Sequence, residues 1–404
     1  MRIHDFTGPI HRQGETRYAD GRVAWNTDID QYPAVVAEAT GAGDVRAALL
    51  TAREHGVPLA VQSTGHGTLV PCDGGVLVKT SRMAGVEIDP ARRIAVAEPG
   101  ALWGEVVAAA APYGLAPLSG SMSLGVAGYT LGGGAGWLSR RYGLAADSLT
   151  AAEVVTADGR ILETDEERHP DLFWALRGGS GNFGVATRLE FRLYPVERVL
   201  AGITMHSFER AADTLAFFAE WEQPDTVNVA LFLMRPEDGP PMLGVRVFAL
   251  DGAGPDLEPL LKRAGDPVHG ELAETDFPEA SARLAPEHGP APLRMGFAFF
   301  ETMPEDLRAV LLEVPTGGVE IRHWGGAMAA PGGPAGHREA RFSVLSGEPL
   351  DLPHATGGTF LNFLSDPARV ATAYTPSAFA RLRELKKVWD PDGVLRPSLY
   401  IAPA

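Results

Sequence analysis

The hydrophobic positions in the first half of the chain follow the periods of both strands and helices. Short apolar runs predict strands at residues 32–36, 59–61, 76–78 and 94–96. Asp44 is a favourable N-cap for a helix, and Gly56 is suited to end it. A second amphipathic helix is predicted from four apolar residues at helical spacing: Leu102, Val106, Val107 and Ala110. This mixture of elements is typical of an α+β fold.

Further along, the pattern predicts a hairpin, a short helix and a longer strand. Asp158-Gly159 is a favourable tight turn between the apolar runs at 152–155 and 161–162. Pro170 is suited to the first turn of a helix. From 185 to 193, large apolar residues alternate with charged ones, which predicts a strand with one buried face.

The sequence changes character after Pro195. We expect residues 1–196 to form a first domain of two α+β subdomains, and the more aromatic residues 197–366 to form a second. Residues 367–404 contain one amphipathic helix that should stop at Asp390. We expect this C-terminal segment to return to the first domain.

Composition and charge exclude several classes of function. With a net charge of −16 and no cluster of Lys and Arg, the 404-residue chain is not expected to bind nucleic acid. It has no signal peptide and no run of about 18 apolar residues, so we expect a soluble, cytoplasmic protein without a membrane partner. Dispersed histidines and one cysteine, Cys72, predict no metal site, and no G-x-S-x-G serine motif occurs.

Residues 179–184 match the G-x-G-x-x-G pattern letter for letter. A dinucleotide-binding Rossmann motif requires a helix after these glycines, so that the helix amides meet the pyrophosphate. Here a strand is predicted to follow. The match therefore indicates a glycine-rich turn near a ligand, or a close backbone contact.

Residues 62–68, Gln-Ser-Thr-Gly-His-Gly-Thr, follow a predicted strand with small and hydroxyl side chains. Their amides could form a concave anion-binding nest that suits a pyrophosphate. A plain loop with a solvated His66 is equally compatible with this spacing.

Residues 115–136 are so rich in glycine and small side chains that we expect a loop rather than packed elements. No lysine follows the glycines, so the segment is not a P-loop. Missing side chains favour backbone pressed against a flat or extended ligand. A mobile surface loop would instead expose the interleaved apolar residues Val126, Tyr129, Leu131 and Trp137.

Together these segments resemble the FAD-binding domain of the vanillyl-alcohol oxidase and p-cresol methylhydroxylase superfamily, most closely its berberine bridge enzyme-like branch. The resemblance covers about residues 32–196 and the end of the chain. Its markers are Gly65-His66, Ser81-Arg82-Met83, the segment 86–90, the loop 125–136, the segments 142–147 and 169–179, Asn182-Phe183-Gly184, and the tail 389–394.

This resemblance implies a two-part FAD-binding domain of the p-cresol methylhydroxylase type and an α+β substrate domain with an antiparallel sheet. It also implies a covalent bond from His66 to the flavin. The bond should be single, because Ser121 stands where doubly attached members have a cysteine. The expected cofactor contacts are His66 with Ser63, Thr64, Gly65, Gly67, Thr68, Ser121, Gly125, Gly128, Tyr129, Gly132, Gly133, Gly136, Asp147, Asn182 and Val185.

The function expected from the resemblance is an FAD-dependent oxidase. A small organic substrate gives hydride to the flavin, and molecular oxygen takes the electrons. The short second domain resembles that of bacterial members that tailor secondary metabolites, so we expect this setting. The candidates for a catalytic base are Tyr400, Tyr374 and Tyr129.

A second hypothesis is a flavin-binding enzyme that shapes or cyclises a reactive intermediate without net oxidation. It is favoured by two departures from the family pattern. Phe360 stands where tyrosine is common, and the strand at 342–346 lacks the glutamate base of plant members. Retention of His66 and of the glycine-rich loop favours the oxidase.

Overall fold

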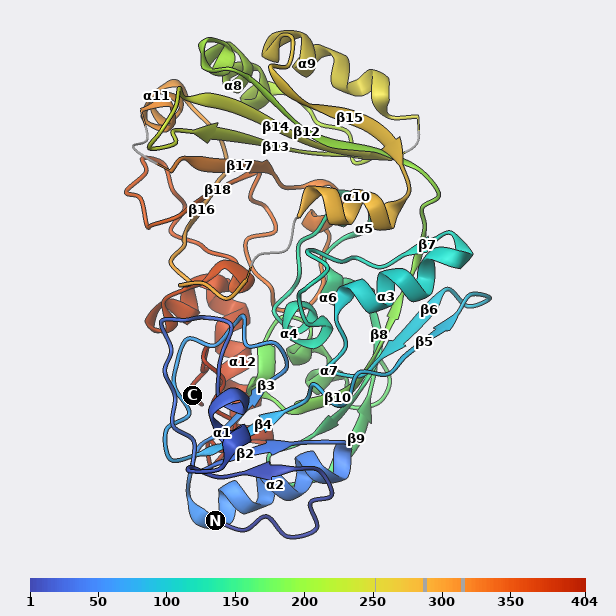
Figure 1. Ribbon diagram of the computed structural model, residues 1–404, viewed down its shortest axis with the longest axis vertical. Helices are drawn as coiled ribbons and strands as arrows, with labels where there is room; N and C mark the ends of the chain where they lie inside the picture. Colours follow the sequence, from blue (N-terminus) through green and yellow to red (C-terminus); the bar gives the residue numbers. More distant parts are fainter. Residues whose placement is uncertain (251, 286–288, 314–316) are drawn as a thin grey trace.

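The computed structural model describes residues 1–250, 252–285, 289–313 and 317–404. Figure 1 shows an elongated molecule with a large antiparallel sheet and its helices at one end and smaller sheets toward the other. Helices and sheets are mixed throughout, so the predicted α+β class is confirmed. In the described part of the chain, no helix combines the length and the apolar character needed to cross a membrane.

The first sheet is four-stranded and has the order β1-β2-β4-β3. Its strands are β1 (Ile10–His11), β2 (Val35–Glu38), β3 (Leu59–Gln62) and β4 (Val76–Lys79). The last three run parallel, and α2 (Ala42–His55) packs its apolar face against them, whereas α1 (Thr16–Gly21) lies near the edge. Because parallel strands end at one edge of a sheet, the segments after β3 and β4 meet there.

The start of α2 corrects one prediction. Asp44 is not the N-cap, because Gly41 occupies that position and Asp44 lies inside the first turn. Its buried carboxylate instead accepts hydrogen bonds from the amides of Thr40, at 2.8 Å, and Thr7, at 2.7 Å, so it fastens the preceding segment to the helix. Gly56 ends the helix with φ of 62°, as predicted.

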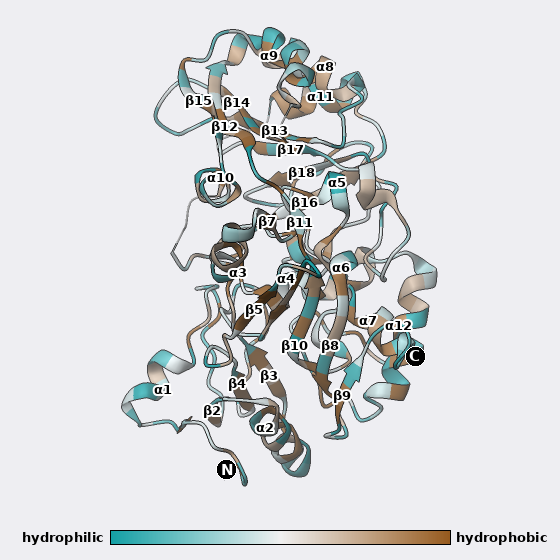
Figure 2. Ribbon diagram, turned by 90° about the vertical axis from the view of Figure 1, so that its right-hand side faces the viewer, coloured by the Kyte–Doolittle hydropathy of each residue, from teal (hydrophilic) through white to brown (hydrophobic). Residues whose placement is uncertain are grey.

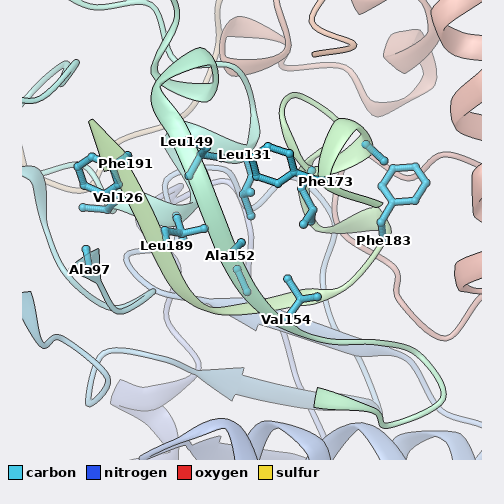
Figure 3. Close-up of a cluster of buried hydrophobic side chains, with 14 of the residues drawn as sticks. Ala97, Val126, Leu131, Leu149, Ala152, Val154, Phe173, Phe183, Leu189 and Phe191 are labelled. Carbon is cyan, nitrogen blue, oxygen red and sulfur yellow. The ribbon is translucent and has the colours of Figure 1, made fainter. Parts of the chain in front are cut away.

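The second sheet is antiparallel and has the order β5-β6-β10-β8-β9. Its strands are β5 (Val86–Asp89), β6 (Ile94–Ala97), β8 (Leu149–Val155), β9 (Ile161–Thr164) and β10 (Val185–Arg192). The helices packed on it include α3 (Trp103–Ala110) and α7 (Pro170–Leu176). Figure 3 shows part of the core on this sheet, which contains Leu149, Leu189 and Phe191 from its strands, Phe173 from α7, and Val126. The predicted hairpin, helix start and strand are confirmed.

The glycine-rich segment contains more regular structure than we predicted. It forms β7 (Leu115–Ala116), which pairs with β11 (Tyr194–Pro195), and then α4 (Val126–Leu131). Two further short helices follow, α5 (Ser139–Tyr142) and α6 (Ala145–Ser148). The loop prediction was wrong over α4 because Val126 and Leu131 are buried in the core and hold the turn in place.

The third sheet has seven antiparallel strands in the order β15-β12-β14-β13-β17-β18-β16. They are β12 (Val199–Ser207), β13 (Val227–Met234), β14 (Met242–Leu250), β15 (His269–Thr275), β16 (Gly296–Phe300), β17 (Val319–His323) and β18 (Phe342–Ser346). One face packs against α8 (Ala211–Glu220), α9 (Glu258–Ala264) and α11 (Glu305–Leu312). In Figure 1 these helices lie on the outer side of the sheet, whereas α10 (Phe277–Leu284) lies on the side toward the other sheets.

The C-terminal segment packs against the first part of the chain. Helix α12 (Pro376–Trp389) lies beside α7, as Figure 2 shows. The buried ammonium of Lys386 donates to Asp390 Oδ2, at 2.6 Å, and to the carbonyl of Asn182, at 2.7 Å. Leu395 forms a bridge with Leu59, so the tail lies next to β3. The domain boundaries at 196 and 366 stay a prediction.

Short 3₁₀ helices connect the larger elements. They lie at Ala111–Tyr113, Ser180–Asn182, Phe208–Arg210, Gly254–Leu257, Gly326–Ala329, Leu361–Phe363 and Pro367–Ala373. The one at Ser180–Asn182 is followed directly by β10. The G-x-G-x-x-G match therefore precedes a strand, as predicted, and does not form a Rossmann motif.

Candidate functional site

A cavity of about 580 Å³ lies between the two smaller sheets and the inner face of the seven-stranded sheet. One end is formed by the loop after β3, the start of α4 and the C-terminal tail. The other end is formed by side chains of β13, β14 and β17. We call these the backbone end, lined by residues 63–70, 120–136 and 395–399, and the sheet end, lined by Trp137, Asn228, Arg246, Arg322, His323, Trp324 and Phe363.

The loop after β3 presents hydrogen-bond donors at the backbone end. Within the described residues, the amides from Thr64 to Gly67 donate to no protein acceptor. The hydroxyl of Ser63 is buried and also lacks a partner. Gly65 has φ of 85°, and a side chain there would meet the backbone of Trp25 at 2.8 Å. This loop therefore has the unmet donors and the tight backbone that suit an anionic group.

His66 lies in this loop and lines the cavity. Its ring stacks on Trp25 with 4.5 Å between the centroids, and its Nδ1 shares a hydrogen bond of 2.8 Å with the hydroxyl of Thr64. Burial lowers the pKa of His66 to about 4. The imidazole is therefore neutral at neutral pH and has a nitrogen lone pair for bonding.

The glycines from 125 to 136 fall into two groups. Side chains at Gly132, Gly133 or Gly134 would collide with the protein itself, with the nearest atoms in Asn362, Phe360 and Tyr129 at 2.5–2.8 Å. At Gly128, by contrast, an added Cβ meets no atom of the described residues within 4 Å, and the same holds for Gly67. Both of these residues line the cavity. Protein packing explains the first group of glycines, and only the second leaves room for a ligand.

Most of the predicted cofactor residues line the cavity together. They are Ser63, Thr64, Gly65, His66, Gly67, Thr68, Ser121, Gly125, Gly128, Tyr129, Gly132, Gly136 and Val185. Three others do not. Gly133 packs against Phe360, and Asp147 forms a two-pronged ion pair with Arg338 at 2.8 and 2.9 Å. Asn182 is fully buried and binds the tail, through Leu399 O at 2.9 Å and Ile401 N at 2.8 Å.

The three tyrosines proposed as bases occupy different surroundings. Burial raises the pKa of all three phenols, which opposes the role of a base at neutral pH. Tyr374 donates to Gly178 O at 3.0 Å, and neither it nor Tyr400 lines the cavity. Tyr129 does line it, and its buried hydroxyl has no partner among the described residues. Only the charge of Arg322 partly offsets the effect of burial on Tyr129.

The charged residues at the sheet end are not evident from the sequence. Arg246 of β14 and Arg322 of β17 both line the cavity, and Glu320 of β17 lies between their guanidinium groups. The signals available are a single arginine inside the apolar run 242–250 and charges two residues apart in 319–323. Neither signal reveals that the two strands place these charges together.

His323 also lines the sheet end. Its Nε2 donates to Phe218 O at 2.8 Å, and burial lowers the pKa of His323 to about 3. The ring is therefore neutral. Among the described residues, no group of His, Cys, Asp and Glu side chains is arranged to hold a metal ion.

Comparison with known families and proteins identifies related chains. A family described as an FAD binding domain matches residues 33–165. An uncharacterized FAD-linked oxidoreductase of Bacillus subtilis is 29% identical, with 98% of each chain covered. The (R)-6-hydroxynicotine oxidase of Paenarthrobacter nicotinovorans is likewise 29% identical, again with 98% of each chain covered.

Solved structures share the whole fold. The structure of 6-hydroxy-D-nicotine oxidase from Arthrobacter nicotinovorans has a TM-score of 0.85 at 25% identity, covering 99% of this chain and 98% of that one. A berberine bridge enzyme-like protein of Physcomitrella patens has a TM-score of 0.87 at 20% identity, covering 98% and 97%. The glucooligosaccharide oxidase of Acremonium strictum, described with a 6-S-cysteinyl, 8α-N1-histidyl FAD, has a TM-score of 0.85 at 21% identity, covering 98% and 97%.

Proposed function

Because the chain belongs to the FAD-linked oxidoreductases of the vanillyl-alcohol oxidase and p-cresol methylhydroxylase superfamily, as its motifs predicted, we propose that it is an oxidase. In this proposal the protein carries FAD on His66 and oxidises a small organic substrate with molecular oxygen. The observation that carries this proposal is the position of a neutral imidazole in a single cavity that has a backbone-lined end and a side-chain-lined end.

The residues at the backbone end fit FAD. The free amides of 64–67 and the unpaired hydroxyl of Ser63 match the oxygens of a pyrophosphate. The open space beside Gly67 and Gly128 is unfilled by protein. The cavity volume of about 580 Å³ lies within the usual range of about 300–1,000 Å³ for ligand sites.

We place the covalent attachment at His66 alone. Its uncharged ring is the nucleophilic form, and the hydrogen bond to Thr64 fixes its orientation. The glucooligosaccharide oxidase has both a histidyl and a cysteinyl bond. In this chain Ser121 lines the cavity and forms a 3.2 Å hydrogen bond with Ser123, and its hydroxyl is a poor substitute for a thiolate. One tether is therefore expected.

FAD, when bound, supplies the redox chemistry, since it accepts a hydride and passes the electrons to oxygen. The residues of this chain bind and orient the substrate. The aromatic side chains of Trp137, Trp324 and Phe363 form apolar walls that exclude water. Burial keeps the proton on Tyr129, so its hydroxyl is assigned the role of a hydrogen-bond donor to the substrate.

The test compares aerobic and anaerobic reactions of the purified holoenzyme with a panel of alcohols, amines and cyclic precursors, as used in the tailoring of secondary metabolites. An oxidase produces peroxide in air and loses its yellow flavin absorbance without oxygen. Product formation with neither peroxide nor bleaching would contradict the oxidase and identify the shaping or cyclising enzyme instead.

A further inference from the structure

Two guanidinium groups share one carboxylate on the inner face of the seven-stranded sheet. Arg322 binds Glu320 through both prongs, with Nε to Oε1 at 2.5 Å and Nη2 to Oε2 at 3.0 Å. Arg246 donates from Nη2 to the same Oε1. In the sheet register, Arg246 and Arg322 both pair with Ala230, so they lie in one row across three strands. We call these three residues the Arg-Glu-Arg cluster.

The Arg-Glu-Arg cluster has an unbalanced positive charge. Burial alone would raise the pKa of Glu320, but the charges of Arg322 and Arg246 lower it to about 2, so the carboxylate is ionised. Burial lowers the pKa of Arg246 to about 10, which still leaves it charged at neutral pH. Within the described residues, Glu320 is the only carboxylate acting on either guanidinium. The cluster therefore has a net charge of +1.

An uncompensated buried charge is costly, because desolvation is repaid only by a counter-charge or by hydrogen bonds. The side-chain exposures in the cluster are 10% for Arg246, 11% for Glu320 and 22% for Arg322. Aromatic faces offset part of the cost. The guanidinium of Arg246 lies 4.8 Å from the ring of Trp137, and that of Arg322 lies 5.2 Å from Phe363.

The polar groups around this charge that lack hydrogen-bond partners are donors. Nε and Nη1 of Arg246 and Nη1 of Arg322 bind no acceptor among the described residues. The buried indole N–H of Trp137 and hydroxyl of Tyr129 are also unpaired. Asn228 also lines this end of the cavity, and its amide donates to the backbone carbonyls of Gly136 and Trp137 at 3.2 and 3.1 Å. A ligand that accepts hydrogen bonds and carries negative charge would satisfy this set.

We propose that the Arg-Glu-Arg cluster binds a carboxylate of the substrate, so that the substrate is an organic acid. One unit of positive charge matches a carboxylate better than a phosphate dianion, and guanidinium groups bind carboxylates through paired N–H donors. This inference rests on the proposed function, because that function makes the cavity a substrate site and the cluster lines the sheet end of this cavity.

The test measures binding rather than turnover. Calorimetric titration of the purified holoenzyme with 3-phenylpropionate and with its neutral amide reports affinity whether or not either compound is oxidised. Failure of the oxidase proposal therefore remains distinguishable from failure of this one. We expect the acid to bind at least about tenfold more tightly than the amide, the effect of one charge-assisted hydrogen bond.

Two variants test whether the preference for the acid over the amide depends on the Arg-Glu-Arg cluster. Arg322→Gln and Arg246→Gln each leave a one-to-one pair with Glu320, so each should fold, which circular dichroism would verify. Each should weaken binding of the acid at least about tenfold and leave the amide unchanged. The control is Arg141→Gln, which removes an arginine paired with Asp225 at 2.7 Å outside the cavity lining and should change neither affinity.

Equal affinities for acid and amide would overturn the proposal, as would variants that leave acid binding unchanged. A third result would assign the guanidinium groups to the flavin instead. In that case both variants weaken formation of the flavin–sulfite adduct, measured by absorbance, while the affinity for the acid stays at the wild-type value.

Discussion

The two ends of the cavity are built by different means. The backbone end uses main-chain amides, hydroxyls and glycines from three continuous segments, at the edge where the parallel strands of the first sheet end. The sheet end uses arginine and aromatic side chains from separate antiparallel strands. A site made of contiguous backbone can be read from sequence, whereas a site assembled across strands cannot. The same division separates the proposed cofactor from the proposed substrate.

The largest expected effect is at Gly128. Leucine at this position fills space that the protein leaves open, so Gly128→Leu should weaken the non-covalent binding of FAD that precedes attachment about 10- to 100-fold, as overpacking by about 1–3 kcal/mol would. The matched control is Gly43→Leu, a second helical glycine whose Cβ would also meet nothing within 4 Å. Flavin absorbance per protein measures the result. Equal flavin content in both variants would show that the open space beside Gly128 does not belong to the FAD site.

An effect of similar size, on stability, is expected at Asn362, which binds the glycine-rich segment at two points. Its Oδ1 accepts from the amide of Gly134 at 2.9 Å, and its Nδ2 donates to Tyr129 O at 3.0 Å. Asn362→Ala leaves both backbone groups without partners and should cost about 1–3 kcal/mol of unfolding free energy. Chemical denaturation of the apoprotein measures this loss. An unchanged midpoint would show that the glycine-rich helix is held without this residue.

Variants of Tyr374 and Tyr129 should separate an effect on protein stability from an effect on substrate oxidation. Tyr374→Phe removes the hydrogen bond to Gly178 and should cost about 1 kcal/mol of stability without affecting oxidation. Tyr129→Phe removes a hydroxyl that has no partner in the described part of the chain, so stability should be unchanged while kcat/KM falls about tenfold. Steady-state kinetics and thermal unfolding of both variants provide the comparison. The reverse pattern would exclude Tyr129 from the substrate site.

The smallest expected effect is that of pH on the rate at which FAD attaches to His66. A histidine with an ordinary pKa of about 6.5 loses its free base below that pH. Burial lowers the pKa of His66 to about 4, so the ring stays neutral on the acid side until the pH approaches 4. Attachment of FAD to the apoprotein should therefore proceed at the same rate from pH 8 to pH 5.5. A rate that halves near pH 6.5 would show that His66 is solvated.

Much of the fold follows from local signals. Alternation predicted β10, Pro170 predicted the start of α7, and Asp158-Gly159 predicted the turn between β8 and β9. These signals work because each depends on a few neighbouring residues. The family motifs predicted the FAD-binding fold as a whole.

Other features depend on contacts distant in sequence. Composition could not show that Val126 and Leu131 anchor a helix inside the glycine-rich segment, since their partners lie in other elements. Nor could it show that Asp44 binds Thr7, 37 residues away. The pairing of Arg246 with Glu320 spans 74 residues and requires the strand register of the third sheet. The charged residues of the sheet end were therefore not predicted, because only the folded sheet brings them together.

The most direct test of the account is to ask whether the flavin stays with His66. The purified protein is precipitated in acid, and the pellet is digested and analysed by mass spectrometry. We predict that the yellow colour remains in the pellet and that the added flavin mass lies on the peptide containing His66. Release of all the flavin into the supernatant, or its attachment to another residue, would contradict the account.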